Sequence, residues 1–100
     1  MKHKLCRLED LQNDTITAFN LGDKKIAVVY KDNTLYAFDD CCTHEECPLS
    51  DGYTEGENVV CPCHGAKFDM KTGRAVALPA VEDVNVYHIY EEDGDVYIDI

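Results

Sequence analysis

Residues 15–38 read TITAFNLGDKKIAVVYKDNTLYAF, and this stretch decides the fold class. Three runs rich in β-branched and aromatic residues, 15–21, 25–31 and 34–38, are separated by the turn pairs Gly22-Asp23 and Asp32-Asn33. Short apolar runs joined by such turn residues are typical of antiparallel hairpins. The stretch therefore predicts three consecutive antiparallel strands.

The C-terminal end repeats this pattern. Residues 84–92 and 95–100 are joined by Asp93-Gly94, and the second run alternates apolar with polar residues, as a half-buried strand does. A sustained helical period is missing throughout. The expected fold class is all-β, a small antiparallel sandwich that forms a single domain over residues 1–100.

A segment of different composition, about residues 40–79, separates these two β regions. It holds five of the six cysteines, all three prolines and four of the six glycines. Such a composition indicates loops that carry a functional site on a β scaffold. Only short strands are expected inside this inserted subdomain, at 58–60 and 67–69.

Composition excludes several classes of function. A formal net charge of −11 argues against nucleic acid, because phosphate binding needs clustered Lys and Arg. The chain has no apolar run near the roughly 20 residues of a membrane span, and its charged N-terminus lacks the apolar region of a secretory signal. We therefore expect a cytoplasmic protein without membrane contact. Six cysteines are many for such a protein, and they favour metal ligation over disulfides alone.

The metal ligands are expected in two loops, CCTHEECPL at 41–49 and CPCHGAKFD at 61–69. Cys42 and His44 form a C-x-H motif in the first loop, and Cys61 and His64 form a C-x-x-H motif in the second. Cys41 also precedes the first motif, but only Cys42 keeps the spacing to the histidine. Two thiolates and two imidazoles can converge on one metal centre.

This ligand set fits two different centres. A tetrahedral Zn²⁺ site with two Cys and two His is one alternative. The other is a two-iron cluster in which one iron takes both cysteines and the other takes both histidines. Each loop here supplies one Cys and one His, and that mixed arrangement favours the two-iron cluster.

These motifs resemble those of the Rieske family. Further matching positions are Leu49 to Gly52, Gly65, Phe68-Asp69, Thr72-Gly73, Leu78-Pro79 and Asp93 to Val96. The resemblance covers nearly the whole chain and implies a Rieske-like sandwich with one [2Fe-2S] cluster per chain. Its ligands would be Cys42, His44, Cys61 and His64, and Pro79 would belong to a loop that covers the cluster.

The resemblance is mixed at the positions around the ligands. Cys47 and Cys63 stand where respiratory Rieske proteins have a disulfide between the two loops, whereas many oxygenase-type ferredoxins lack that pair. The resemblance therefore implies a disulfide, against which stands a reducing cytosol. Ala66 and Phe68 follow Gly65, at positions where high-potential Rieske sites carry a serine and a tyrosine.

The implied function is electron transfer rather than catalysis. Similar soluble ferredoxins take one electron at a time from a flavin-dependent ferredoxin reductase and pass it to a terminal oxygenase. One hundred residues leave little room for a large substrate pocket, which also favours a carrier over an enzyme. The alternative is a Rieske small subunit of a larger oxidoreductase, such as a nitrite reductase.

Overall fold

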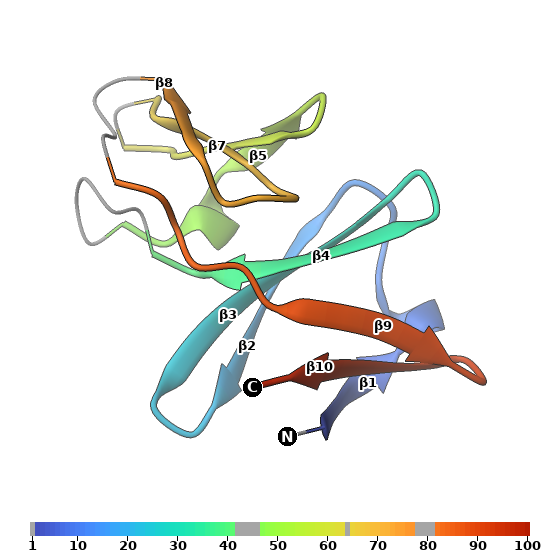
Figure 1. The fold of residues 1–100 in the computed structure, drawn as a ribbon. Helices are drawn as coiled ribbons and strands as arrows, with labels where there is room; N and C mark the ends of the chain where they lie inside the picture. The colour runs from blue at the N-terminus through green and yellow to red at the C-terminus, as the bar shows by residue number, and fades with distance from the viewer. Residues whose placement is uncertain (1, 42–46, 64, 78–81) are drawn as a thin grey trace.

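The computed structural model describes residues 2–41, 47–63, 65–77 and 82–100, and its regular structure there consists of antiparallel β-strands and two short 3-10 helices (Figure 1). The elements in chain order are β1 (Lys2–Arg7), the 3-10 helix η1 (Leu8–Asp10), β2 (Ile16–Leu21), β3 (Lys24–Lys31), β4 (Thr34–Asp39), the 3-10 helix η2 (Leu49–Asp51), β5 (Tyr53–Glu55), β6 (Asn58–Val60), β7 (Lys67–Asp69), β8 (Ala75–Ala77), β9 (His88–Glu92) and β10 (Asp95–Asp99). The predicted all-β class is confirmed.

The strands form three sheets with sheet B, of order β2-β3-β4, in the middle. Its central strand β3 contains the run Ile26–Val29, whose four residues are completely buried. Successive strand residues point to opposite faces of a sheet. Ile26 and Val28 accordingly pack in one apolar core, and Ala27 and Val29 pack in another. The middle sheet is thus covered on both faces, which explains the continuous apolar run.

Sheet A, of order β1-β10-β9, covers the first face of sheet B. Val96 and Ile98 of β10 are fully buried and join Ile26 and Val28 in a shared core. Strand β1 pairs with β10, so the beginning and the end of the described chain lie side by side.

Sheet C, of order β5-β6-β7-β8, lies over the opposite face and occupies residues 53–77 of the predicted insertion. Each of its strands has only three residues. Val59 and Phe68 face each other across β6 and β7 and are fully buried in the core with Ala27 and Val29. This second core fixes the small sheet, and hence the loops that it carries, to the sandwich.

The predicted hairpins are confirmed with shifts of about one residue at their ends, and the short strands 58–60 and 67–69 match β6 and β7. The expected strand 84–92 is wrong in its first half, because β9 starts at His88. Residues 84–87 are instead an irregular segment beside β4: the Asp39 N–H donates to the Asn85 carbonyl at 3.0 Å, and the Tyr87 N–H donates to the Ala37 carbonyl at 2.9 Å.

Strands β5 and β8 are additions to the sequence-based expectation. In the described part of the chain, no helix reaches the length and apolarity that crossing a membrane requires.

Candidate metal centre

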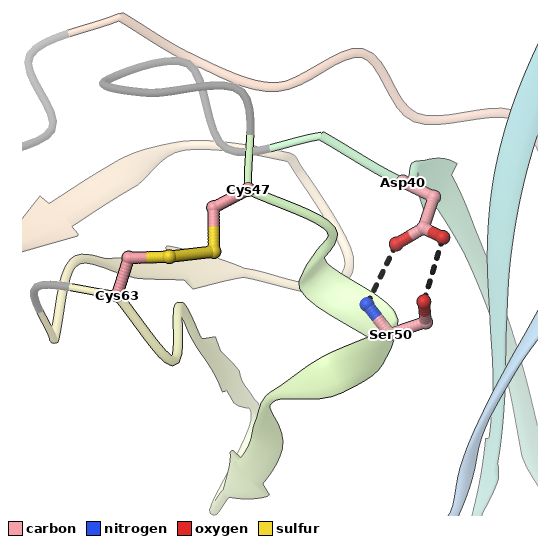
Figure 2. Close-up of a disulfide and its surroundings, with 4 residues drawn as sticks. All are labelled: Asp40, Cys47, Ser50 and Cys63. Atoms are coloured by element: carbon pink, nitrogen blue, oxygen red, sulfur yellow. Dashed lines mark hydrogen bonds between the residues drawn. A yellow bond between two sulfur atoms is a disulfide. The ribbon is translucent and has the colours of Figure 1, made fainter.

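The first predicted ligand loop leaves β4 and ends at η2. Cys42 and His44 lie outside the described residues, whereas the two ends of the loop are described. At these ends, the Asp40 carboxylate accepts hydrogen bonds from the Ser50 N–H at 2.6 Å and from the Ser50 hydroxyl at 2.7 Å (Figure 2). Asp40 is buried, with an exposed fraction of 8%. This pair of bonds holds together the start and the end of the loop, and we call it the Asp40–Ser50 clamp.

The second predicted ligand loop joins β6 to β7. Its backbone is closed by two hydrogen bonds, from the Cys61 N–H to the Ala66 carbonyl at 2.7 Å and from the Gly65 N–H to the Cys61 carbonyl at 3.1 Å. Gly65 has a φ of +73°, a left-handed conformation that side chains with a Cβ adopt only under strain. The chain can therefore turn sharply after the C-x-x-H motif and return directly into β7. His64 itself lies outside the described residues.

A disulfide between Cys47 and Cys63 joins the two loops, with an S–S distance of 1.98 Å and Cα atoms 6.5 Å apart (Figure 2). The pairing implied by the resemblance is thereby confirmed. Cys47 is buried and Cys63 is exposed, so the disulfide runs from the core to the surface. The Sγ atom of Cys61 lies close by: the three Sγ atoms are all within 4.8 Å of one another.

The interior beside these sulfurs is apolar. Cys61 is 2% exposed, and Ala66 and Phe68 are completely buried. All three belong to the same core cluster, together with Cys47 and Leu49 of the first loop. Burial in such surroundings raises the strength of every nearby electrostatic interaction, because little water is present to screen it. The methyl group of Ala66 and the ring of Phe68 offer no hydrogen-bond donor to a sulfur there.

Two features of the site escaped sequence reasoning. One is the Asp40–Ser50 clamp, which joins two residues that are ten positions apart in the sequence. The other is Gly52, where a Cβ would lie 2.0 Å from the Val60 carbonyl oxygen and 3.2 Å from the Pro62 ring. The end of the first loop thus approaches the second loop closely, and only a residue without a side chain fits. Both features involve the Leu-Ser-Asp-Gly sequence at 49–52, and this short motif was the one hint of them in the sequence.

The segment that returns toward β9 is tied to the end of β4 by Asp39. This carboxylate accepts a hydrogen bond from the Asn85 side-chain amide at 3.0 Å and another from the Tyr87 hydroxyl. Partial burial, together with the bond to the Asp39 carboxylate, raises the pKa of Tyr87 from 10.0 to about 12. Both effects disfavour the charged phenolate.

The described donor set is compatible with a cluster that takes few thiolates. The disulfide withdraws Cys47 and Cys63 from metal ligation, so Cys61 is the buried thiol that remains at this place. A metal centre with one thiolate from each loop needs further ligands of another type. In the sequence, each of the two motifs contains a histidine that can be such a ligand. A Rieske centre has such a set of two cysteines and two histidines. Pro79, the other predicted neighbour, lies outside the described residues.

Comparisons with known proteins agree with this chemistry. The sequence model of the Rieske [2Fe-2S] domain matches residues 1–88. The ferredoxin component of the naphthalene 1,2-dioxygenase system of Pseudomonas putida is 32% identical over 93% of this chain and 89% of its own length. The ferredoxin subunit of the 3-phenylpropionate/cinnamic acid dioxygenase of Escherichia coli K12 is 38% identical over 92% of this chain and 81% of its own length.

Solved structures give the same result. The structure titled as a complex of reduced oxygenase and oxidised ferredoxin in carbazole 1,9a-dioxygenase contains a chain that matches with a TM-score of 0.91 and 33% identity. The match covers 97% of this chain and 91% of that one. A nitrite reductase small subunit matches with a TM-score of 0.85 but only 22% identity over 100% of this chain and 99% of its own, which shows a shared fold alone.

The matched relatives are named as ferredoxins, and the match extends over most of their length, so no additional catalytic domain of theirs is left unmatched. The chain therefore belongs to the Rieske [2Fe-2S] domain family, and it is an electron carrier of the ferredoxin type that binds a [2Fe-2S] cluster.

Proposed function

We propose that this protein carries single electrons from a flavin-dependent ferredoxin reductase to a terminal oxygenase, on a cluster held by Cys42, His44, Cys61 and His64. One observation carries the proposal. The protein matches a chain of a structure titled as an oxygenase–ferredoxin complex, and the match covers 91% of that chain. We place this exchange in the cytoplasm, where nicotinamide-driven reductases find their electron source.

The proposed ligand set is supported by the position of Cys61. Its thiol is buried at the end of β6, beside the disulfide that joins the two loops. The closed backbone turn around Gly65 brings the chain past the C-x-x-H motif and directly back into the core at Ala66. Fixed loops on a rigid sheet suit a site that must change its charge without changing its shape.

When bound, a [2Fe-2S] cluster with two neutral imidazole ligands accepts one electron more readily than a four-cysteine cluster does. The chain's own contribution is to fix the loops and to surround the sulfur of Cys61 with apolar groups. The clamp and the disulfide perform the first task. Ala66, Phe68 and Leu49 perform the second.

A second candidate function is a permanent small subunit of a larger oxidoreductase such as a nitrite reductase. The fold that the protein shares with a nitrite reductase small subunit is the observation in favour of this candidate. The identity of 22% is too low to show a shared function. The relatives named as ferredoxin components of dioxygenase systems support the carrier instead.

Size-exclusion chromatography of a native extract separates the two proposals. A free carrier of 11.3 kDa should elute by itself, at high and at low salt. A permanent subunit should elute with a much larger partner under both conditions, and that result would contradict the carrier.

The electron route is tested with purified components. The reduced protein, mixed without oxygen with the terminal oxygenase of the same source, should be reoxidised with transfer of one electron per chain. The reductase, with its nicotinamide substrate, should then reduce it again. Failure of either half-reaction would remove the corresponding partner from the proposal.

A further inference from the structure

Three sulfur atoms from two separate loops meet at one point of the structure. Cys47 comes from the first loop, Cys61 and Cys63 come from the second, and their Sγ atoms all lie within 4.8 Å of one another. In the structure, two of the three are joined as a disulfide. Cys47 and Cys61 are buried with exposed fractions of 7% and 2%, whereas Cys63 is exposed.

We propose that reduction of the Cys47–Cys63 disulfide converts these three sulfurs into a thiolate site for Zn²⁺, which the disulfide otherwise keeps closed. Thiolates bind zinc at about 2.3 Å in tetrahedral geometry, so two ligating sulfurs are about 3.8 Å apart. The sulfurs of the protein already lie within 4.8 Å of one another. Opening the S–S bond and small side-chain rotations therefore suffice, and the fourth position of the zinc stays open to a further ligand.

The step that opens the site is a thiol–disulfide exchange. A dithiol reductant attacks one sulfur of the disulfide and then closes its own disulfide, so that two electrons and two protons pass to Cys47 and Cys63 as two thiols. The exposed Cys63 sulfur gives the reductant access. Zn²⁺ then replaces the protons of Cys47 and Cys63, because thiolates rather than thiols are its ligands. At Cys61 it replaces the proton in a chain without a cluster, or the bound iron, which is released, in the holoprotein.

The consequence concerns which metal the loops hold. Closed zinc sites are often built from three or four thiolates, so a pair of thiolates added beside Cys61 favours zinc at this place. The disulfide removes this pair and thereby protects the site from zinc. This competition rests on the proposed function, because Cys61 belongs to both ligand sets.

The first test uses the holoprotein. Reduction with a phosphine in the presence of Zn²⁺ should bleach the cluster and leave about one zinc per chain, whereas phosphine alone or Zn²⁺ alone should leave the cluster absorbance largely unchanged. The variant with both Cys47→Ser and Cys63→Ser lacks the bond that fixes the loops and can lose its cluster sooner, but its rate of bleaching should be the same with and without phosphine and zinc. An equal increase of bleaching by phosphine with zinc in the variant and in the wild type would overturn the proposed competition.

The second test isolates the three thiols. A full-length chain with Cys6, Cys41, Cys42, His44 and His64 replaced by Ala can form neither the proposed cluster nor a Cys₂His₂ zinc site, and it keeps only the cysteines Cys47, Cys61 and Cys63. After phosphine treatment it should bind Zn²⁺ in competition with a chromophoric chelator, and Co²⁺ should give sulfur-to-cobalt charge-transfer absorption. Removing a hydrogen-bond partner of a metal ligand weakens metal binding by about 10- to 100-fold. Removing a ligand itself should weaken metal binding at least as much.

The matched control adds Cys47→Ser to this chain, and circular dichroism checks that both chains are folded. Metal affinity that is equal with and without Cys47, or equal before and after reduction, would overturn the zinc site. If this chain binds zinc as expected while the wild-type holoprotein keeps its cluster under phosphine and zinc, the zinc site stands and the proposed competition with the cluster fails.

Discussion

Two buried side chains of the second ligand loop, Ala66 and Phe68, are proposed to limit how well the protein can stabilise added negative charge. They belong to the same core cluster as Cys61 and Cys47 and carry no hydroxyl group. A hydroxyl that donates to a sulfur stabilises the reduced cluster more than the oxidised one, because reduction adds a negative charge. The lack of both donors predicts a reduction potential toward the low end of the range of about −150 to +300 mV.

The double substitution Ala66→Ser with Phe68→Tyr should raise the midpoint potential. Each hydrogen bond to a charged group is worth about 1.5 kcal/mol, and about 1.4 kcal/mol corresponds to 59 mV for one electron. The expected rise is thus on the order of 100 mV, measured by protein-film voltammetry. Ala37→Ser with Phe19→Tyr, in the other core, is the matched control and should leave the potential unchanged. No rise in the first variant would show that positions 66 and 68 do not set the potential.

Tyr87 makes the free energy of unfolding depend on pH. Its pKa is raised from 10.0 to about 12 by burial and by the hydrogen bond to Asp39, so the folded protein holds this proton more tightly than the unfolded chain does. The free energy of unfolding must therefore fall as the pH rises from about 10 to about 12, whereas below pH 10 the contribution is fully present.

Urea unfolding over this pH range tests the origin of the effect. Tyr87→Phe has no phenol to titrate, so its stability should fall less steeply than that of the wild type. Parallel curves for the two proteins would assign the loss of stability to other groups.

At the scale of elements, the first ligand loop depends on the clamp at its two ends. Ser50 supplies both donors to the buried Asp40 carboxylate, one from its backbone and one from its hydroxyl group. Ser50→Ala removes the hydroxyl donor and leaves a buried charged group partly unsatisfied, which costs about 1–3 kcal/mol of stability. The cluster should also be lost sooner on heating, because the loop is less firmly held.

Thr54→Ala is the matched control for the clamp. The Thr54 hydroxyl also donates to a carboxylate, that of Asp14, but this pair is exposed and lies outside the ligand loops. Its loss should change stability by less than about 1 kcal/mol and leave the cluster's lifetime unaltered. Equal cluster lifetimes in Ser50→Ala and the wild type would show that the clamp does not hold the loop.

The elements also show what the sequence could and could not predict. The hairpins of sheet B were predictable because their turns are local and their apolar runs are long. The first half of the expected strand 84–92 was wrong because those residues bond to β4 rather than to a neighbour in sequence. Strands β5 and β8 are the edges of sheet C and contain no buried residue, so they lack the apolar signal that β6 and β7 carry.

The candidate site, like the fold, was predictable from the sequence only in part. The two motifs proposed to hold the ligands could be found in the sequence because cysteine and histidine spacing is a local property of the chain, and this ligand set stays a prediction. The Asp40–Ser50 clamp and the contact of Gly52 with Val60 depend on residues that meet only in the folded protein. The Cys47–Cys63 pairing came from the resemblance, since the spacing of six cysteines alone does not determine a partner.

At the scale of the whole molecule, a net charge of −11 should steer docking to positively charged partners. Glu55, one of the acidic residues in the insertion, is paired with Lys67 at 2.7 Å, which reduces its contribution. Asp51 is exposed and follows the first ligand loop directly. We expect electron transfer to the partner to slow as salt screens charges over about 10 Å.

Charge reversal separates local from global steering. Asp51→Lys should reproduce the effect of high salt on the transfer rate, because Asp51 lies next to the first ligand loop, where we expect the partner to dock. Glu9→Lys changes the net charge by the same amount. Because Glu9 belongs to η1, which lies beside sheet A (Figure 1), this variant should slow electron transfer less. Stopped-flow rates that respond equally to both variants would indicate that only the total charge matters.

The central claim is that Cys42, His44, Cys61 and His64 hold one [2Fe-2S] cluster that takes up a single electron. Pulsed electron paramagnetic resonance, on protein reduced anaerobically with one electron equivalent per chain, tests it most directly. The predicted result is about one unpaired spin per chain, coupled to the nitrogens of two histidine imidazoles. A paramagnetic cluster without nitrogen coupling, or a protein that shows no paramagnetic signal and contains zinc instead of iron, would contradict the claim.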